Sequence, residues 1–353
     1  MSLSFFLGAN SARGFYSLYD DLINLEDAER VYILKGGPGS GKSSIMKKAV
    51  FAAEEKKIPF ELIYCSSDPD SLDGVIFPTL RKAIVDGTAP HIVEPKFPLA
   101  VEQYVDLGRF ADINSISLKK EEIIKAKKTH SEYFKHIYRL TSGALQIENE
   151  LFDIALGGIS LEKLKKRAKG IISRELNGKG LEKSVKRRFS SAISPKGYIS
   201  SIADSVIDFT RIYVIEDDFG LSHFLLTPIA DAFLSADFGC IKCLNPLNPE
   251  RLEHLIIPEL SLAFVTSGKE VPYEGISYRK IRLNSSIDKN VLKSKKHRIS
   301  ILKKLKSDLI ADACNLLAEA KLSHDKLEDL YNPHIDFDSL YDYAEKLIAE
   351  IFK

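Results

Sequence analysis

Short apolar runs alternate along the chain with longer segments in which apolar residues recur every three or four positions. The runs at 30–34, 60–65 and 82–85 have the length and the β-branched character of buried strands, whereas segment 42–57 has the spacing of an amphipathic helix. Runs of the same kind recur at 211–215 and 262–265. Because strands alternate with helices, the pattern predicts an α/β fold with mostly parallel sheets.

Longer segments with a helical period follow each set of predicted strands. They span 117–140, 141–156, 161–176, 297–322 and 337–352. Each half of the chain therefore predicts an α/β domain that carries a helical extension. We place the first domain at 1–180, with its extension at about 117–180, and the second at 185–353.

The loop after the first of these strands, "KGGPGSGKSS", matches the phosphate-binding pattern Gly-x4-Gly-Lys-Ser in full. Glycines let backbone N–H groups face an anion, the lysine contacts the β- and γ-phosphates, and the serine hydroxyl is an Mg²⁺ ligand. The strand before the loop and the helix after it provide the context that the motif requires. The predicted nucleotide-binding residues are Gly36, Gly37, Pro38, Gly39, Ser40, Gly41, Lys42, Ser43 and Ser44.

Segments of the second half repeat segments of the first half in the same order. "FLGANSARGFYSLYDD" (6–21) aligns with "FSSAISPKGYISSIAD" (189–204), and "RVYIL" (30–34) aligns with "RIYVI" (211–215). "LDGVIFPTLRKAIVDG" (72–87) aligns with "LEHLIIPELSLAFVTS" (252–267). Such similarity predicts an internal duplication, and hence tandem P-loop NTPase-like domains of one fold.

The repeat indicates that the second phosphate loop has lost its function. The residues aligned with Gly36, Gly41, Lys42 and Ser43 are Asp217, Ser222, His223 and Phe224. Two carboxylates, Asp217 and Asp218, then stand where an anion would bind, and they would repel it. We expect the second repeat to be structural or regulatory and to bind no nucleotide.

Two acidic residues are candidates for the remaining chemistry. Asp86 ends the apolar run "KAIVD", and its partner in the repeat is Thr266, so the lysine and the acid are lost together. We assign Asp86, with Ser43, to Mg²⁺ binding, although an acid before Gly87 could simply cap a turn. Asp68 is the favoured water-directing acid, ahead of Asp70 and Asp73. The alternative is an Asp-rich turn without catalytic work.

Charge and cysteine content exclude few functions. The 353-residue chain has a formal net charge of +1, but residues 117–190 hold 18 Lys/Arg against 9 Asp/Glu. That basic helical region could bind nucleic acid or an acidic protein, or it could be a solvated helix face. Cys240 and Cys243 are three apart in a predicted strand, which favours buried thiols on opposite faces over a metal or redox pair. With neither a signal peptide nor an apolar run of membrane-spanning length, we expect a cytoplasmic protein.

Several stretches resemble a bacterial family of two-copy P-loop proteins, which is described broadly as ATPases or nucleotide-kinase-like. They are "FFLGAN…GFYSLYD", "KGGPGSGKSS", "CSSDPDSLDGVI" and "DGTAPH". The resemblance implies ATP binding at Gly36–Ser43. It does not define a substrate. The expected function is an Mg²⁺-dependent ATPase in which Lys42, Asp68 and Asp86 are catalytic. The alternatives are a kinase for a nucleotide or small molecule, or a nucleotide-regulated binding module.

Overall fold

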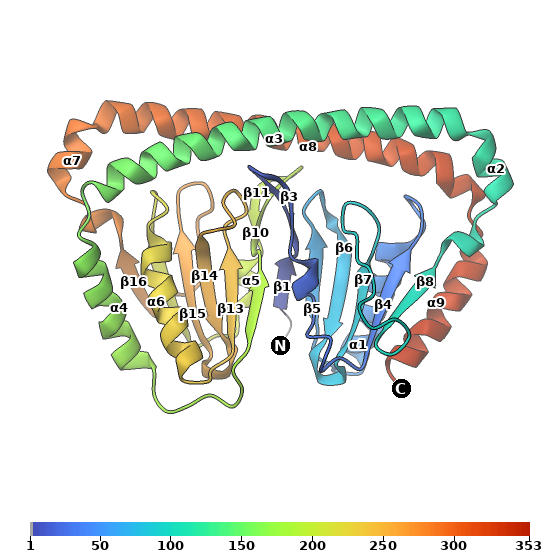
Figure 1. Ribbon diagram of the computed structural model, residues 1–353, viewed down its shortest axis with the longest axis horizontal. Helices are drawn as coiled ribbons and strands as arrows, with labels where there is room; N and C mark the ends of the chain where they lie inside the picture. The colour runs from blue at the N-terminus through green and yellow to red at the C-terminus, as the bar shows by residue number, and fades with distance from the viewer. Residues whose placement is uncertain (1–2) are drawn as a thin grey trace.

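The computed structural model describes residues 3–353, which form two lobes under a pair of long helices (Figure 1). Each lobe is built around a six-stranded sheet, with strand order β1-β5-β6-β7-β4-β8 in one and β9-β13-β14-β15-β12-β16 in the other. The first sheet contains β1 (Leu3–Phe6), β4 (Arg30–Lys35), β5 (Glu61–Cys65), β6 (Asp68–Phe77), β7 (Lys82–Asp86) and β8 (Glu102–Asp106). The second contains β9 (Val185–Arg188), β12 (Arg211–Glu216), β13 (Cys240–Leu244), β14 (Leu252–Ile257), β15 (Leu262–Ser267) and β16 (Arg279–Arg282).

The two sheets are mixed and mostly parallel, as predicted for the fold class. β6 runs antiparallel to both β5 and β7, and β14 runs antiparallel to both β13 and β15. The other neighbouring strands pair in parallel. The sequence does not predict the antiparallel strand, because the Asp, Ser and Pro residues of 66–74 favour turns. Residues 66–67 form a tight turn, and β6 begins at Asp68.

The strand order shows that the two lobes repeat one topology. β4, α1 (Lys42–Glu55), β5, β6 and β7 of the first lobe follow one another as β12, α6 (Ser222–Ser235), β13, β14 and β15 do in the second. A small hairpin follows the first strand of each sheet. These hairpins are β2 (Gly8–Ser11) with β3 (Gly14–Ser17), and β10 (Ser191–Ser194) with β11 (Gly197–Ser200), and the short helix α5 (Ile202–Ser205) follows the latter.

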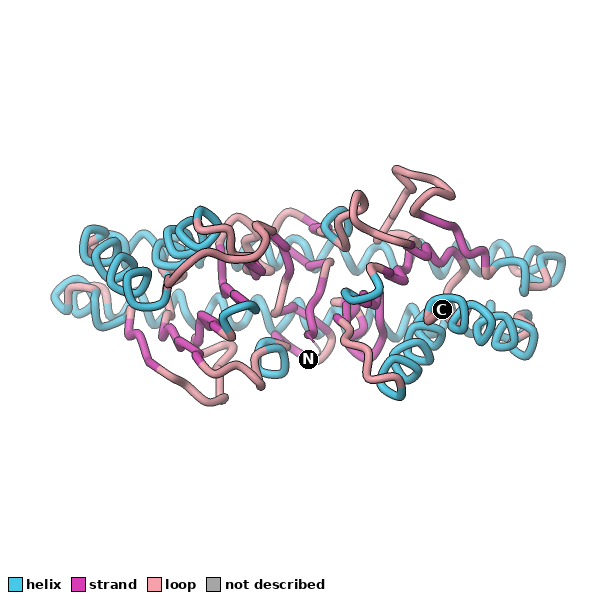
Figure 2. Tube along the Cα trace, turned by 90° about the horizontal axis from the view of Figure 1, so that it is seen from below, coloured by secondary structure: helices cyan, strands magenta, loops and turns pink. Residues whose placement is uncertain are grey.

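Two long helices, α3 (Lys120–Leu156) and α8 (Lys296–Tyr331), run antiparallel across the tops of both sheets (Figures 1 and 2). Segments 117–140 and 141–156 had been predicted as separate helices, but they are continuous. Gly143 lies within the helix and faces Leu309 of α8, whose Cδ1 is 3.4 Å from the position of a Cβ at residue 143. A glycine inside the helix therefore allows close approach of α8 rather than ending the helix. Short helices, α2 (Ile113–Leu118) and α7 (Lys289–Ser294), precede the long ones.

The last helix of each repeat packs against the sheet of the other repeat. α4 (Leu161–Glu175) follows α3 and buries Leu164, Ala168 and Ile171 in the core of the second lobe. α9 (Phe337–Ile351) follows α8 and buries Leu340 and Leu347 in the core of the first lobe. The packing units therefore differ from the sequence repeats at 1–180 and 185–353, because the long helices carry each helical extension across the molecule (Figure 1).

The lobes are joined through the edges of their sheets. Phe6 and Phe189 exchange backbone hydrogen bonds of 2.7 and 2.9 Å, and residues of both repeats share one apolar cluster. The guanidinium of Arg188, which is fully buried, donates to the carboxylate of Glu61 across the junction. Burial alone would raise the pKa of Glu61, but Arg188 and Lys186 lower it. Such a pair fixes the relative position of the lobes, since breaking it would leave a buried charge.

The structure also tests the predicted burial of two cysteine thiols. Cys240 and Cys243 are free and buried in two different apolar clusters, so the prediction of buried thiols on opposite faces is confirmed.

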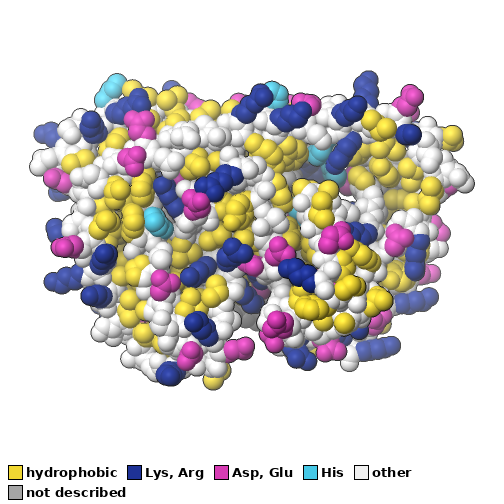
Figure 3. Space-filling model, in the orientation of Figure 1, with side chains coloured by type: hydrophobic (Ala, Val, Ile, Leu, Met, Phe, Trp, Pro, Cys, Tyr) yellow, Lys and Arg dark blue, Asp and Glu magenta, His cyan; other side chains and the backbone are white. Residues whose placement is uncertain are grey.

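Within residues 3–353, no helix has the length and apolar character needed to cross a membrane. On the face in Figure 3, Lys and Arg side chains are interspersed with Asp and Glu rather than gathered in one patch.

Candidate functional site

The glycine-rich segment forms a turn between β4 and α1, at the carboxyl edge of the first sheet. Gly39 and Gly41 have φ angles of +69° and +78°, in the left-handed region that favours glycine. Lys42 is the first residue of α1, and Gly41 caps the helix. Strand, loop and helix therefore follow in the order that the sequence pattern predicts.

The structure brings Lys42 and Asp86 together. The ammonium Nζ of Lys42 lies 3.8 Å from Oδ2 of Asp86, and both side chains are about seven-eighths buried. The same Nζ donates to the carbonyl oxygens of Gly36 and Gly37, at 3.2 and 3.0 Å. Oδ1 of Asp86 accepts from the backbone N–H and the hydroxyl of Thr88, at 2.8 and 2.6 Å. A lysine in the loop and an acid on the neighbouring strand β7 thus form one charged centre.

The oxygen ligands near this centre fit Mg²⁺. The hydroxyl oxygen of Ser43 accepts from the backbone N–H of Leu72 at 3.0 Å, and its proton is free to turn away. Ser43 and Asp86 present a hydroxyl and a carboxylate, the hard oxygen donors that Mg²⁺ prefers. When bound, Mg²⁺ would neutralise charge on the β- and γ-phosphates.

The C-terminal end of α8 lies on the glycine-rich loop. Oε1 of Glu328 accepts from the backbone N–H of Gly39 at 3.0 Å. A Cβ at Gly37 would be 3.1 Å from the ring of Tyr331, and a Cβ at Gly39 would be 2.0 Å from Oδ1 of Asn332. A carboxylate from the second repeat therefore accepts a hydrogen bond from a loop amide of the kind that binds phosphate.

Glu328 is held in its charged form. A hydrogen bond from His324 lowers the pKa of Glu328, and the amide of Gly39 and the charge of Lys321 lower it further, against the opposing effect of burial. Nothing in the local sequence signals this role, because Glu and His four residues apart are ordinary on a helix. The contact links residues 289 positions apart in the chain, so only the tertiary structure reveals it.

Asp68 and Asp70 lie at the start of β6, and both are paired. Asp68 accepts from the hydroxyl of Ser71 at 2.8 Å and forms an ion pair with Lys321 of α8 at 3.4 Å. Asp70 pairs with Lys196 of the second repeat at 2.6 Å on the surface. Asp68 is thus bound by the same helix that contacts the glycine-rich loop.

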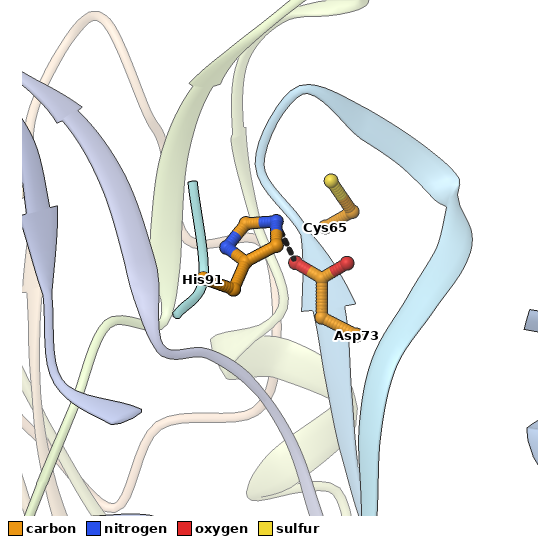
Figure 4. A group of neighbouring side chains, drawn as sticks. All are labelled: Cys65, Asp73 and His91. Carbon is orange, nitrogen blue, oxygen red and sulfur yellow. Dashed lines mark ion pairs between the residues drawn. The ribbon is translucent and has the colours of Figure 1, made fainter. Parts of the chain in front are cut away.

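Asp73, the third acid of this segment, has unexpected partners. Its Oδ2 accepts from the hydroxyl of Tyr19 at 2.8 Å and lies 3.3 Å from Nε2 of His91, and the thiol of Cys65 is beside it (Figure 4). Burial raises the pKa of Asp73; His91 opposes this effect, and the nearby charge of Asp86 adds to it. The sequence placed Asp73 near the site but gave no reason to associate it with Cys65 or His91.

The corresponding loop of the second lobe is closed by its own side chain. Oδ1 and Oδ2 of Asp217 accept from the backbone N–H groups of Phe219 and Ser222, at 2.9 and 2.6 Å. This loop is one residue shorter, so Ser222 rather than His223 begins the helix and takes the place of Lys42. His223 instead stacks on Phe152 of α3, and burial lowers its pKa to about 4. The predicted pairing of Lys42 with His223 is wrong by this one position.

A cavity of about 730 Å³ opens beside this second loop, between the sheet and α8. Several of its charged side chains are paired with one another. Lys303 binds Asp218 at 3.2 Å, and Lys306 binds Glu148 and Glu270 at 3.3 and 2.8 Å. Lys303 and Lys306 of α8 are therefore already neutralised. Lys304 of the same helix and Lys269 also line the cavity.

Comparisons of the chain with protein-family models, with curated proteins and with solved structures give no match. The resemblance noted in the sequence therefore stays a prediction, and the functional argument rests on the geometry of the site.

Proposed function

We propose that the protein is an Mg²⁺-dependent ATPase with one nucleotide site, formed by Gly36–Ser44 and Asp86 of the first repeat. The observation that carries the proposal is the placement of Lys42 beside Asp86 at the end of a glycine-rich loop, 3.8 Å apart. In phosphoryl transfer most of the catalytic effect comes from positioned charge, so a lysine for the phosphates and an acid for the metal are the parts required.

Each residue of the site then has one role. Lys42 leaves the carbonyl groups of Gly36 and Gly37 and binds the β- and γ-phosphates. Ser43 and Asp86 hold Mg²⁺. Asp68 is the proposed acid that orients the attacking water, once it is released from Lys321. The loop amides take the phosphate oxygens in place of Glu328.

The geometry also supports a coupling between nucleotide binding and α8. Phosphate and the carboxylate of Glu328 compete for the amide of Gly39, and the same helix holds Asp68 through Lys321. Nucleotide binding therefore requires the end of α8 to move. Because coupling is reciprocal, any partner that pulls α8 away should tighten nucleotide binding. α8 is continuous to the second lobe, where Lys303 and Lys306 anchor it.

A kinase remains the second candidate, but its arginines are engaged elsewhere. Arg81 pairs with Glu29 on the surface at 3.5 Å, and Arg109 lies over the rings of Phe110 and Tyr343. Both arginines are thus held by other side chains, whereas a kinase would need cations near the transferred phosphate.

Two measurements on the intact chain test the proposal. Calorimetry should give one ATP per chain in the presence of Mg²⁺. Phosphate release should proceed without an added acceptor, whereas phosphate transfer to members of an acceptor library would favour the kinase. Two nucleotides per chain, or binding with neither hydrolysis nor transfer, would overturn the ATPase assignment.

A further inference from the structure

Cys65, Asp73 and His91 bring one sulfur, one oxygen and one nitrogen ligand together behind the charged centre. These atoms lie within 4.8 Å of one another, and they come from three separate elements: the end of β5, the middle of β6 and the loop that follows β7 (Figure 4). Asp73 and His91 are 5% and 7% exposed. Cys65 is half-buried. A cluster of three such groups, two of them buried, is unlike the exposed acidic clusters that occur by chance on surfaces.

The spacing suits a small tetrahedral ion. Two ligand atoms that each lie 2.0–2.1 Å from a tetrahedral zinc ion are about 3.3 Å apart. Nε2 of His91 and Oδ2 of Asp73 are 3.3 Å apart. The thiol sulfur of Cys65 lies within 4.8 Å of a ligand atom of each of these two residues.

The types of ligand favour a borderline-soft cation. Thiolate and imidazole select Zn²⁺ and its neighbours in the first transition row, whereas Mg²⁺ takes oxygen ligands. This set therefore differs from Ser43 and Asp86, which present oxygen alone.

We propose that Cys65, Asp73 and His91 form a Zn²⁺ site that is distinct from the Mg²⁺ site of the nucleotide. Three protein ligands leave a fourth position for water or for the hydroxyl of Tyr19, which already donates to Asp73 at 2.8 Å. Metal binding releases the proton of the thiol to solvent, and His91 binds through Nε2 as the neutral tautomer that carries its proton on Nδ1.

The ion would fix the loop that follows Asp86. Thr88, which donates twice to Asp86, is three residues before His91, and the amide of His91 donates to the carbonyl of Thr88 at 2.8 Å. Anchoring His91 to β5 and β6 therefore restrains the segment that orients Asp86. The site is a positioning device, and it is independent of whether the nucleotide is hydrolysed.

The test uses Co²⁺ as a coloured probe for the site. The purified full-length chain is stripped with a chelator and titrated with Co²⁺. One equivalent should bind, with the absorption bands of a tetrahedral ion and a thiolate-to-cobalt charge-transfer band. Zn²⁺ should then bleach both. Zn²⁺ should also raise the melting temperature of the chain. Mg²⁺ should neither bleach the cobalt bands nor raise the melting temperature.

Variants identify the ligands. Cys65→Ser should remove the charge-transfer band, and His91→Ala should weaken Co²⁺ binding by at least about 100-fold, since loss of an outer-shell partner already costs about 10–100-fold. Cys314→Ser, a buried free thiol on α8, is the matched control and should bind as the parent does. Lys42→Ala should also keep the metal, which separates this site from the nucleotide site.

Two outcomes would overturn the proposal. One is a folded parent chain that takes up no Co²⁺ and gains no thermal stability from Zn²⁺. Asp73 would then simply accept hydrogen bonds from Tyr19, Cys65 and His91 as a closed network. The other is a charge-transfer band that persists in Cys65→Ser.

Discussion

The loops that follow β4 and β12 occupy the same place in two copies of one fold, and both hold a carboxylate on their backbone amides. In the first lobe the carboxylate belongs to Glu328, on a helix contributed by the other repeat. In the second lobe it belongs to Asp217, within the loop itself. A helix can move away from the loop it covers, whereas Asp217 cannot leave its neighbours without unfolding the turn.

This difference separates a closed site from a lost one. In the first loop Lys42 lies beside Asp86, so under the proposed function removal of Glu328 would expose the anion site. The second loop has Ser222 at the start of its helix, Thr266 at the end of its strand and its amides already satisfied. An anion there would meet the carboxylates of Asp217 and Asp218.

The largest effect is expected for Lys42→Ala. Without its ammonium group the loop loses a positive charge at the β- and γ-phosphates, and ATP turnover should fall by roughly 10²-fold or more. The fold should be retained, which circular dichroism can verify. His223→Ala in the second loop is the matched control and should leave calorimetric binding unchanged. Parent-level hydrolysis by Lys42→Ala would mean that this loop is not the working site.

Asp86→Asn should separate binding from turnover. The amide keeps the hydrogen bonds from Thr88 but lacks the charge that holds Mg²⁺, so hydrolysis should slow by roughly 10²-fold while ATP still binds. A shift of the Mg²⁺ titration to higher concentration is the expected signature. Asp70→Asn, which alters an exposed acid of the neighbouring strand, serves as the control. An unchanged Mg²⁺ titration would move the metal role to Asp68 or Asp73.

Asp217→Ala should change stability and leave nucleotide binding as it is. It leaves the amides of Phe219 and Ser222 buried without an acceptor, at a cost of about 1–3 kcal/mol for each unsatisfied group. Chemical denaturation should show the loss in the free energy of unfolding. Calorimetry should still find one ATP per chain. A second nucleotide site in this variant would show that the loop is masked rather than lost.

Glu328→Gln should tighten ATP binding, whereas Lys42→Ala and Asp86→Asn should slow ATP turnover. A hydrogen bond to a charged group contributes about 1.5–3 kcal/mol, so weakening it should tighten ATP binding by roughly tenfold. Glu319→Gln, an exposed acid on the same helix, should leave the affinity unchanged. If Glu328→Gln binds ATP no better than the parent, Glu328 does not compete with phosphate.

The smallest effect is a pH dependence of the same contact. The pKa of Glu328 is lowered from 4.5, chiefly by His324, so its contribution to stability is present above pH 4.5 and is lost as pH falls through the lowered value. The difference in unfolding free energy between the parent and Glu328→Gln should therefore shrink below pH 4.5. The charges that face Glu328 are His324 and Lys321. A constant difference across this range would show that the ionised carboxylate is not what holds the helix.

Much of the fold could be predicted because its signals are local. The strand at 30–34, the loop and the helix that begins at Lys42 appear in sequence as they do in the structure. The repeat predicted two copies of one topology, and the sheets have equivalent strand orders. The errors also have local causes. Asp, Ser and Pro in 65–74 favour turns, yet β6 is stabilised by ladders on both of its sides.

The sequence by itself determined where the proposed phosphate site lies, because the glycines and the lysine are adjacent in the chain and the repeat shows which copy keeps the lysine and the acid. Only the tertiary structure decided what covers that loop and what surrounds Asp73. α3 and α8 exchange the helical ends of the two repeats, which brings Glu328 onto Gly39 from 289 residues away. Cys65, Asp73 and His91 likewise meet because β5, β6 and the segment after β7 converge. Side-chain periodicity records which face of an element is buried, but it does not record which distant residue lies opposite.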